Sequence, residues 1–158
     1  SGIGLGMNFA PTDLVQLIEL LVEEIVIAHP GTVIERDLPP SLEADVDAGR
    51  IAQVVANLLS NARHHGSGGP IFVRAEATGG RVSLSVRKAS EPIAPEVAAH
   101  LFDPFKRQSL GNARNPTGMG LGLYIADQII RGHGGEIRYA YERGQVEFRC
   151  SFAQPRAG

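Results

Sequence analysis

The feature that most restricts the fold of this chain is a predicted helix whose apolar face carries two asparagines. Asp47 can cap the start of this helix, and the hydrophobic spacing extends it to about His65. Its core face consists of aliphatic residues at helical spacing: Ile51, Val54, Val55, Leu58, Leu59 and Ala62. Asn57 and Asn61 are four residues apart, so both amides project from the same part of the helix. Burying an amide without a partner costs about 1–3 kcal/mol, so these two amides need partners or a water-filled space.

Two other long helices and about five strands are predicted around this helix. The long helices cover Thr12–His29 and Gly118–Arg131, and a short one covers residues 95–100. The strands are expected at residues 32–36, 71–77, 82–86, 136–141 and 145–152, the last four as two hairpins. We therefore expect an α+β two-layer sandwich, in which three helices cover one face of a mixed, mostly antiparallel sheet.

The composition is that of an ordinary globular protein and excludes several classes of function. The 158 residues fit one domain, with 43% hydrophobic and 20% charged residues. A net charge of −2 provides no basic surface for nucleic acid, and no apolar run approaches the length of a membrane span. The single Cys150 excludes an internal disulfide, and we expect it to be a buried strand residue. We expect a cytoplasmic protein, with no nucleic-acid partner and no membrane contact by this domain.

A glycine-rich segment opens the third long helix. It follows a polar loop at residues 108–117, which is rich in Gly, Asn, Arg and Pro and is predicted to form a mobile lid. The segment consists of Gly118, Met119, Gly120, Leu121, Gly122 and Leu123. Bare backbone N–H groups at such a helix start can contact phosphate oxygens.

The two carboxamides and the glycine segment together predict a pocket for a nucleotide triphosphate. A carboxamide oxygen is a good ligand for Mg²⁺, which usually accompanies bound phosphates. The plainer alternative is that Asn57 and Asn61 lie on the helix surface and bond to a loop.

Three motifs, in this order, make the chain resemble the ATP-binding catalytic domain of bacterial sensor histidine kinases, in the superfamily that includes DNA gyrase, Hsp90 and MutL. Asp47–Ala62 resembles the N box of this family, Leu101–Arg107 the F box and Gly118–Leu123 the G2 box, and Gly134–Ile137 also fits. The resemblance runs over essentially the whole chain. It implies the Bergerat fold, with ATP and Mg²⁺ as cofactors.

The resemblance also implies a role for each matching residue. Asn61 would coordinate a Mg²⁺ ion that bridges the triphosphate, with Asn57 beside it. His64 stands where the family usually has a basic residue for phosphate. Phe102 and Phe105 would anchor the base of the lid, although both are also plausible core aromatics. The residues that would wrap the phosphates are those of the glycine segment: Gly118, Met119, Gly120, Leu121, Gly122 and Leu123.

The segment that reads adenine in this family departs from the pattern. The family has Asp-x-Gly-x-Gly followed by Ile, and here Lys88, Ser90 and Pro92 replace the aspartate and the two glycines, while Ile93 matches. A phytochrome-like subgroup also has Pro-Ile here, so Pro92 fits that version. Lysine has only donors and adenine's amino group also donates, so the usual base contact cannot form. Losing one charge-assisted hydrogen bond would weaken binding about ten- to a hundredfold.

Two interpretations of the function follow from these residues. The first is a kinase domain that binds Mg-ATP and donates the γ-phosphoryl group to a histidine on a separate dimerisation domain of the same protein, with a response regulator in the full pathway. None of the five histidines here has the sequence context of such an acceptor, so residues 1–158 are expected to be one domain of a larger sensor kinase. The second is a degenerate kinase-like domain with weak or no ATP binding, which acts as a regulatory protein-interaction module; Lys88 and Ser90 motivate it.

A gyrase-type or Hsp90-type ATPase is disfavoured. That branch carries a glutamate as general base where this chain has Asn57, and an amide cannot take a proton from water at neutral pH. The substitution favours transfer of the phosphoryl group to a protein side chain over hydrolysis.

Overall fold

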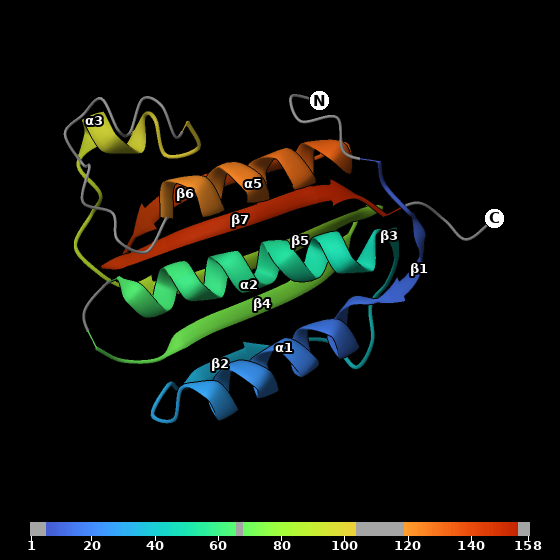
Figure 1. Ribbon diagram of the computed structural model, residues 1–158, viewed down its shortest axis with the longest axis horizontal. Coiled ribbons are helices and arrows are strands. Elements are labelled where there is room, and N and C mark those ends of the chain that lie inside the picture. The colour runs from blue at the N-terminus through green and yellow to red at the C-terminus, as the bar shows by residue number, and fades with distance from the viewer. Residues whose placement is uncertain (1–5, 66–67, 104–118, 155–158) are drawn as a thin grey trace.

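The computed structural model describes residues 6–65, 68–103 and 119–154, and shows a layer of helices on a curved sheet (Figure 1). The strands are β1 (Ala10–Asp13), β2 (Ile34–Asp37), β3 (Glu43–Val46), β4 (Ile71–Thr78), β5 (Arg81–Ala89), β6 (Glu136–Glu142) and β7 (Gln145–Ala153). The helices are α1 (Leu14–Ala28), α2 (Ala48–His64), the short α3 (Pro95–Ala98) and α5 (Met119–Gly132).

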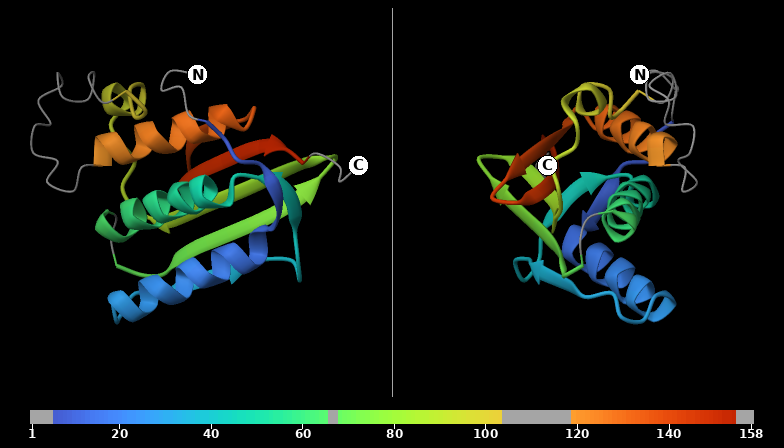
Figure 2. Two further views of the ribbon diagram at one scale, coloured as in Figure 1. Left: turned by 45° about the vertical axis from the view of Figure 1, so that its right-hand side comes forward. Right: turned by 90° about the vertical axis from the view of Figure 1, so that its left-hand side faces the viewer.

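The main sheet has five strands in the order β2-β4-β5-β7-β6. β2 pairs with β4 in parallel, and the other neighbouring strands are antiparallel. The two views of Figure 2 show α1, α2 and α5 on the same face of this sheet. The predicted fold class, a two-layer sandwich with a mixed, mostly antiparallel sheet, is therefore confirmed.

The core lies between the two layers. β4 alternates buried and more exposed residues from Ile71 to Glu76, as expected for a strand with one covered face, whereas β5 has three consecutive buried residues at Leu84, Ser85 and Val86. Their buried aliphatic residues are Ile71, Val73, Ala75, Val82, Leu84 and Val86. Cys150 on β7 is fully buried, as its sequence context predicted, and burial raises the pKa of its thiol to about 12.

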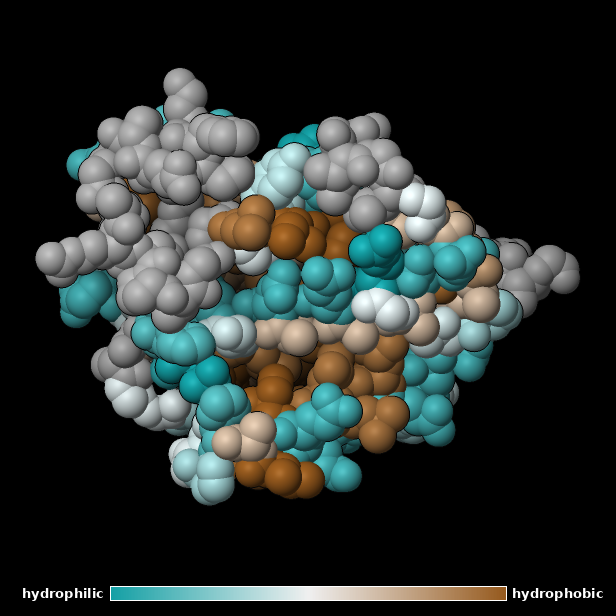
Figure 3. Space-filling model, viewed as in Figure 1, coloured by the Kyte–Doolittle hydropathy of each residue, from teal (hydrophilic) through white to brown (hydrophobic). Residues whose placement is uncertain are grey.

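Each of the first two long helices begins at an aspartate. The Asp13 carboxylate accepts from the Val15 N–H at 3.0 Å, and the Asp47 carboxylate accepts from the Arg50 N–H at 3.1 Å. α2 runs between α1 and α5, and polar side chains along it separate apolar surface over α5 from apolar surface near α1 (Figure 3). Within the described residues, no helix combines the length and the apolar character that crossing a bilayer requires.

The first turn of α2 is a junction of three segments. The Asp47 carboxylate also accepts from the Asn8 N–H at 2.9 Å, and this bond lowers the pKa of Asp47. The Asp47 N–H donates to Nε2 of His133, at 3.1 Å, just after α5. Nδ1 of His133 lies 2.9 Å from the Ile129 carbonyl, which it can contact only as a donor. The chain before β1, the start of α2 and the end of α5 are thus bonded together.

The structure adds elements that the sequence pattern did not predict. β1 and β3 pair antiparallel as a separate two-stranded sheet. Each has only four residues, too few to show a clear two-residue period. β5 also continues to Ala89, three residues beyond its predicted end, because its partner β7 continues to pair with it. Lys88 therefore belongs to a strand and lies opposite Ile71 and Val146.

Candidate nucleotide-binding site

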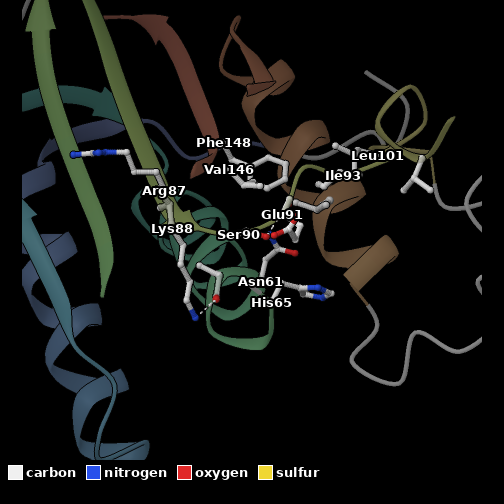
Figure 4. A pocket seen from close by; sticks show the side chains of 14 residues that line it. Asn61, His65, Arg87, Lys88, Ser90, Glu91, Ile93, Leu101, Val146 and Phe148 are labelled. Carbon is white, nitrogen blue, oxygen red and sulfur yellow. Dashed lines mark hydrogen bonds between the residues drawn. The ribbon is translucent and has the colours of Figure 1, made fainter. Parts of the chain in front are cut away.

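A cavity of about 250 Å³ lies between the end of α2, the end of β5 and the start of α5 (Figure 4). Its apolar lining residues are Val86, Ile93, Val97, Leu101, Leu123, Val146 and Phe148. Its polar and charged lining residues are Asn61, His65, Arg87, Lys88, Ser90 and Glu91. A mainly apolar hollow with a few polar groups is typical of sites that bind small molecules.

Asn61 lines this cavity and has a buried polar atom. The residue lies near the end of α2, and only 9% of it is exposed. Its Oδ1 atom is buried and accepts no hydrogen bond from the described residues. Buried acceptors nearly always have a partner, and lacking one costs about 1–3 kcal/mol. Oδ1 of Asn61 is therefore suited to a ligand donor or to a hard cation such as Mg²⁺.

Asn57, one turn earlier, has a different environment. Its Nδ2 atom donates to the Gly122 carbonyl at 3.0 Å, and Asn57 is not among the residues that line the cavity. A Cβ on Gly122 would lie 3.8 Å from the Asn57 amide, an ordinary van der Waals contact, so the Asn57 bond does not itself require a glycine here. The two asparagines that the sequence placed together thus separate: Asn61 lines the cavity, whereas Asn57 joins α2 to α5.

Lys88 is bonded to the end of α2. Its Nζ atom donates to the Ala62 carbonyl at 2.9 Å, shown as a dashed line in Figure 4. Carbonyl groups in the last turn of a helix lack partners within the helix and attract cations. Partial burial lowers the pKa of Lys88. The lysine that replaces the expected aspartate therefore lines the cavity and connects β5 to α2.

The segment after β5 is held by the β6–β7 hairpin. The Ser90 N–H donates to the Gly144 carbonyl at 3.0 Å, and the Tyr141 hydroxyl donates to the Ser90 carbonyl at 3.0 Å. Three residues later, the Ile93 N–H donates to the Tyr139 hydroxyl at 3.2 Å. One wall of the cavity is therefore fixed at both of its ends by hydrogen bonds.

The other predicted site residues lie in several environments. Leu123 is buried and lines the cavity, whereas Leu121 is 56% exposed. Phe102 is half-buried and packs edge-on against Phe148, with ring centroids 6.2 Å apart. His64 is exposed, and its Nδ1 lies 2.8 Å from the Ser60 carbonyl.

Some of the predicted site falls outside what the structure describes. Met119 and Gly120 belong to the first turn of α5. Phe105, Gly118 and the predicted lid at residues 108–117 lie outside the described residues.

Several lining residues were missed by sequence reasoning. The sequence pattern assigned no role to His65, Glu91, Val146 or Phe148, which all line the cavity. Val146 and Phe148 reach the cavity because β7 pairs with β5, which places them opposite Lys88 and Val86. The sequence shows that Val146 and Phe148 are two residues apart and so share a face of β7. It does not show the strand order that places this face beside the cavity.

The chain matches known proteins over most of its length. The family model described as histidine kinase-, DNA gyrase B-, and HSP90-like ATPase matches residues 46–156. A bacteriophytochrome of Pseudomonas aeruginosa is 48% identical over 138 residues, which are 87% of this chain and 19% of that protein. The sensor histidine kinase TrcS of Mycobacterium tuberculosis is 35% identical over 144 residues, which are 87% of this chain and 28% of that protein.

Solved structures show the same architecture. The catalytic domain of the histidine kinase ThkA, in a nucleotide-free form, matches with a TM-score of 0.81 and 27% identity, covering 94% of this chain and 97% of that chain. Full-length ShkA in complex with AMPPNP matches with a TM-score of 0.79 and 27% identity, covering 97% of this chain and 33% of that chain.

Proposed function

Because the chain belongs to the histidine kinase-, DNA gyrase B-, and HSP90-like ATPase family, we propose that it is the ATP-binding catalytic domain of a sensor histidine kinase. It would donate the γ-phosphoryl group of Mg-ATP to a histidine on a separate dimerisation domain of the same protein. The whole protein would act in the cytoplasm, together with a response regulator. The chain spans 19% and 28% of the two relatives above, so these partners belong to the proposal. The observation that carries it is the buried Oδ1 of Asn61, a residue that lines the cavity; this atom accepts no hydrogen bond from the described residues.

The cavity offers each part of a nucleotide a different environment. Its apolar wall, including Ile93, Val146 and Phe148, suits the flat faces of a base. The N–H groups at the start of a helix lack partners within the helix and favour phosphate oxygens, and α5 contributes Leu123 of its early part to the cavity. We place the base against the apolar wall and the triphosphate toward Asn61 and the start of α5, with the predicted lid at residues 108–117 next to the phosphates.

Asn61 is the residue that would hold Mg²⁺, since its free amide oxygen is the kind of ligand that this cation prefers. Bound Mg²⁺ would neutralise negative charge on the phosphate groups during transfer. Phosphoryl transfer depends mainly on position and charge, so such a domain needs few catalytic side chains of its own.

Asn57 supports transfer to a protein over hydrolysis. A hydrolytic enzyme needs a group that can accept a proton from the attacking water, and an amide cannot do so at neutral pH. The Asn57 amide also donates to the Gly122 carbonyl, which holds α2 against the start of α5. Its role in this proposal is to position the two helices on either side of the cavity.

The proposal is tested by a phosphotransfer assay with the dimerisation domain of the same protein as acceptor. With γ-labelled ATP and Mg²⁺, we expect acid-labile phosphate on the acceptor and none on this chain when it is incubated alone. Asn61→Ala should abolish the transfer. If ATP binds but the acceptor gains no phosphate, the domain acts as a binding module instead, and the kinase proposal is wrong.

A further inference from the structure

Glu91 is the only carboxylate among the described residues that line the cavity. We propose that Glu91 accepts a hydrogen bond from the exocyclic amino group of adenine and so determines base specificity in this chain. The inference rests on the proposed function, because it assigns the base-reading group of the same site. It locates the acceptor three residues after Lys88, whose ammonium group can only donate.

The backbone around Glu91 is fixed, so its side chain starts from a defined place. Tyr141 holds the Ser90 carbonyl, and Tyr139 accepts from the Ile93 N–H. The Ser90 hydroxyl donates to the carbonyl of Glu91 itself at 3.0 Å. These bonds flank Glu91 on both sides, and a group held on a fixed segment loses less entropy when it binds a ligand.

The carboxylate of Glu91 is not paired with Lys88 or Arg87, the lysine and the arginine that share the cavity. Lys88 donates to the Ala62 carbonyl at 2.9 Å. Arg87 donates to Oε1 of Gln145 at 2.8 Å, and its guanidinium lies over the ring of Phe72, 4.7 Å from the centroid. Within the described part of the chain, neither cation forms an ion pair with Glu91. Neither of these two cations therefore occupies the carboxylate of Glu91.

The position of Glu91 suits an amino group on the edge of a base. Figure 4 shows Glu91 beside Ser90, whereas the Nζ atom of Lys88 points away from them to the Ala62 carbonyl. Glu91 is exposed and lines the cavity two residues before the apolar wall residue Ile93. A base on that wall would present its polar edge to Glu91, and an ionised carboxylate is a stronger acceptor than an amide or a hydroxyl.

The test compares two nucleotides that differ in the amino group alone. Calorimetry measures the affinity of the 158-residue chain for ATP and for purine riboside triphosphate, which has hydrogen in place of that amino group. Glu91→Ala should weaken ATP binding about tenfold and leave purine riboside triphosphate binding unchanged. Glu91→Gln keeps an acceptor oxygen without the charge, so its affinity for ATP should lie between the affinities of wild type and Glu91→Ala. The control is Glu96→Ala, an exposed glutamate in α3 that does not line the cavity, and it should change neither affinity.

A second arm separates positioning from general stability. Tyr141→Phe removes the donor to the Ser90 carbonyl and should weaken ATP binding in the wild-type background. In the Glu91→Ala background, the same change should have no effect on ATP binding, because its influence acts through Glu91. An equal effect in both backgrounds would contradict this positioning role.

The outcomes distinguish this inference from the proposed function. Equal ATP affinity of wild type and Glu91→Ala, or an equal loss for both nucleotides, would show that Glu91 does not read the amino group, while the kinase proposal stands. Loss of GTP affinity without loss of ATP affinity in Glu91→Ala would also overturn the adenine assignment. Failure of the wild-type chain to bind any of these nucleotides would overturn both proposals.

Discussion

Two asparagines one turn apart show how residues of the same type contribute differently to stability and to binding. Asn57 has a bonding partner on α5, whereas the Oδ1 of Asn61 is buried and has no partner among the residues that the structure describes. The first arrangement stabilises the fold, and the second reduces its stability in the absence of ligand. Such a cost is typical of binding sites, where a local rule is broken for function.

Asn61→Ala should therefore separate stability from binding. Removing this amide, whose oxygen has no partner among the described residues, should leave the free energy of unfolding unchanged or raise it by up to about 1 kcal/mol. The affinity for Mg-ATP should fall at least about tenfold. Urea unfolding and calorimetry measure the two quantities. The matched variant Asn57→Ala should lower stability by about 1 kcal/mol because it removes a satisfied hydrogen bond. A large loss of stability in Asn61→Ala would show that this side chain is structural.

Lys88 stands where the family has an aspartate that contacts the base. Lys88→Asp places an acceptor where the strand meets the cavity and should tighten ATP binding about tenfold. Lys88→Met is the control, because it keeps the apolar stem and loses only the bond to the Ala62 carbonyl; it should not tighten binding. Calorimetry of both variants with ATP provides the measurement. If the two variants bind ATP equally, an acceptor at position 88 does not contact the base.

At the scale of elements, the start of α2 is stabilised by one carboxylate. The Asn8 N–H, and to a smaller extent the Arg50 N–H, bond to the charged form of Asp47 and lower the pKa of Asp47, while burial acts in the opposite direction. A carboxyl group whose pKa is lower in the folded state contributes stability above its unfolded pKa of about 3.9. That contribution is lost as the pH falls through the lower, folded value.

The pH dependence of Asp47→Ala tests this assignment. At neutral pH the variant should be about 1–2 kcal/mol less stable than wild type, because the cap of α2 is lost. The difference should be constant above about pH 5 and should shrink below about pH 4. Urea unfolding followed by circular dichroism at each pH measures it. A difference that persists undiminished to the lowest pH would assign the effect to packing and not to charge.

The turn between α5 and β6 allows a glycine to be tested against its neighbour. A Cβ on Gly135 would collide with the Ser151 carbonyl and with Phe152, both on β7. Gly135→Ala should therefore lower the free energy of unfolding by about 3 kcal/mol. Gly134 has a φ of +74° and open space around it, so Gly134→Ala should cost only about 1 kcal/mol. Thermal or urea unfolding compares them, and an equal cost would contradict the close approach at Gly135.

The elements differ in how far the sequence predicted them. α2 and its cap at Asp47 were predictable because capping and helical periodicity are local properties. The cavity depends on long-range strand order: Phe148 and Val146 reach it because β7 pairs with β5. The different environments of Asn57 and Asn61 also could not be predicted. Helical spacing shows that both side chains point in the same direction, but it does not show which helix lies next to each of them. Lys88 was identified as the decisive departure, but its bond to Ala62 requires β5 to extend to Ala89.

At the scale of the whole molecule, the fold holds a cavity open between its two layers. α2 and α5 lie side by side on the sheet, joined by Asn57 near the cavity and by the His133–Asp47 bond at their other ends (Figure 1). The sheet side of the cavity comes from β5, β7 and the segment that follows β5. This frame resembles that of the histidine kinase catalytic domains, with a TM-score of 0.81 to ThkA. The cavity is thus a property of the packed layers, and the residues that line it decide what it binds.

The central claim is that this cavity binds ATP through Mg²⁺ at Asn61. Calorimetry of the 158-residue chain with ATP, in the presence and absence of Mg²⁺, tests it most directly. We predict saturable binding at one site, with an affinity that rises at least about tenfold when Mg²⁺ is present. Absence of binding at millimolar ATP with Mg²⁺ would contradict the claim.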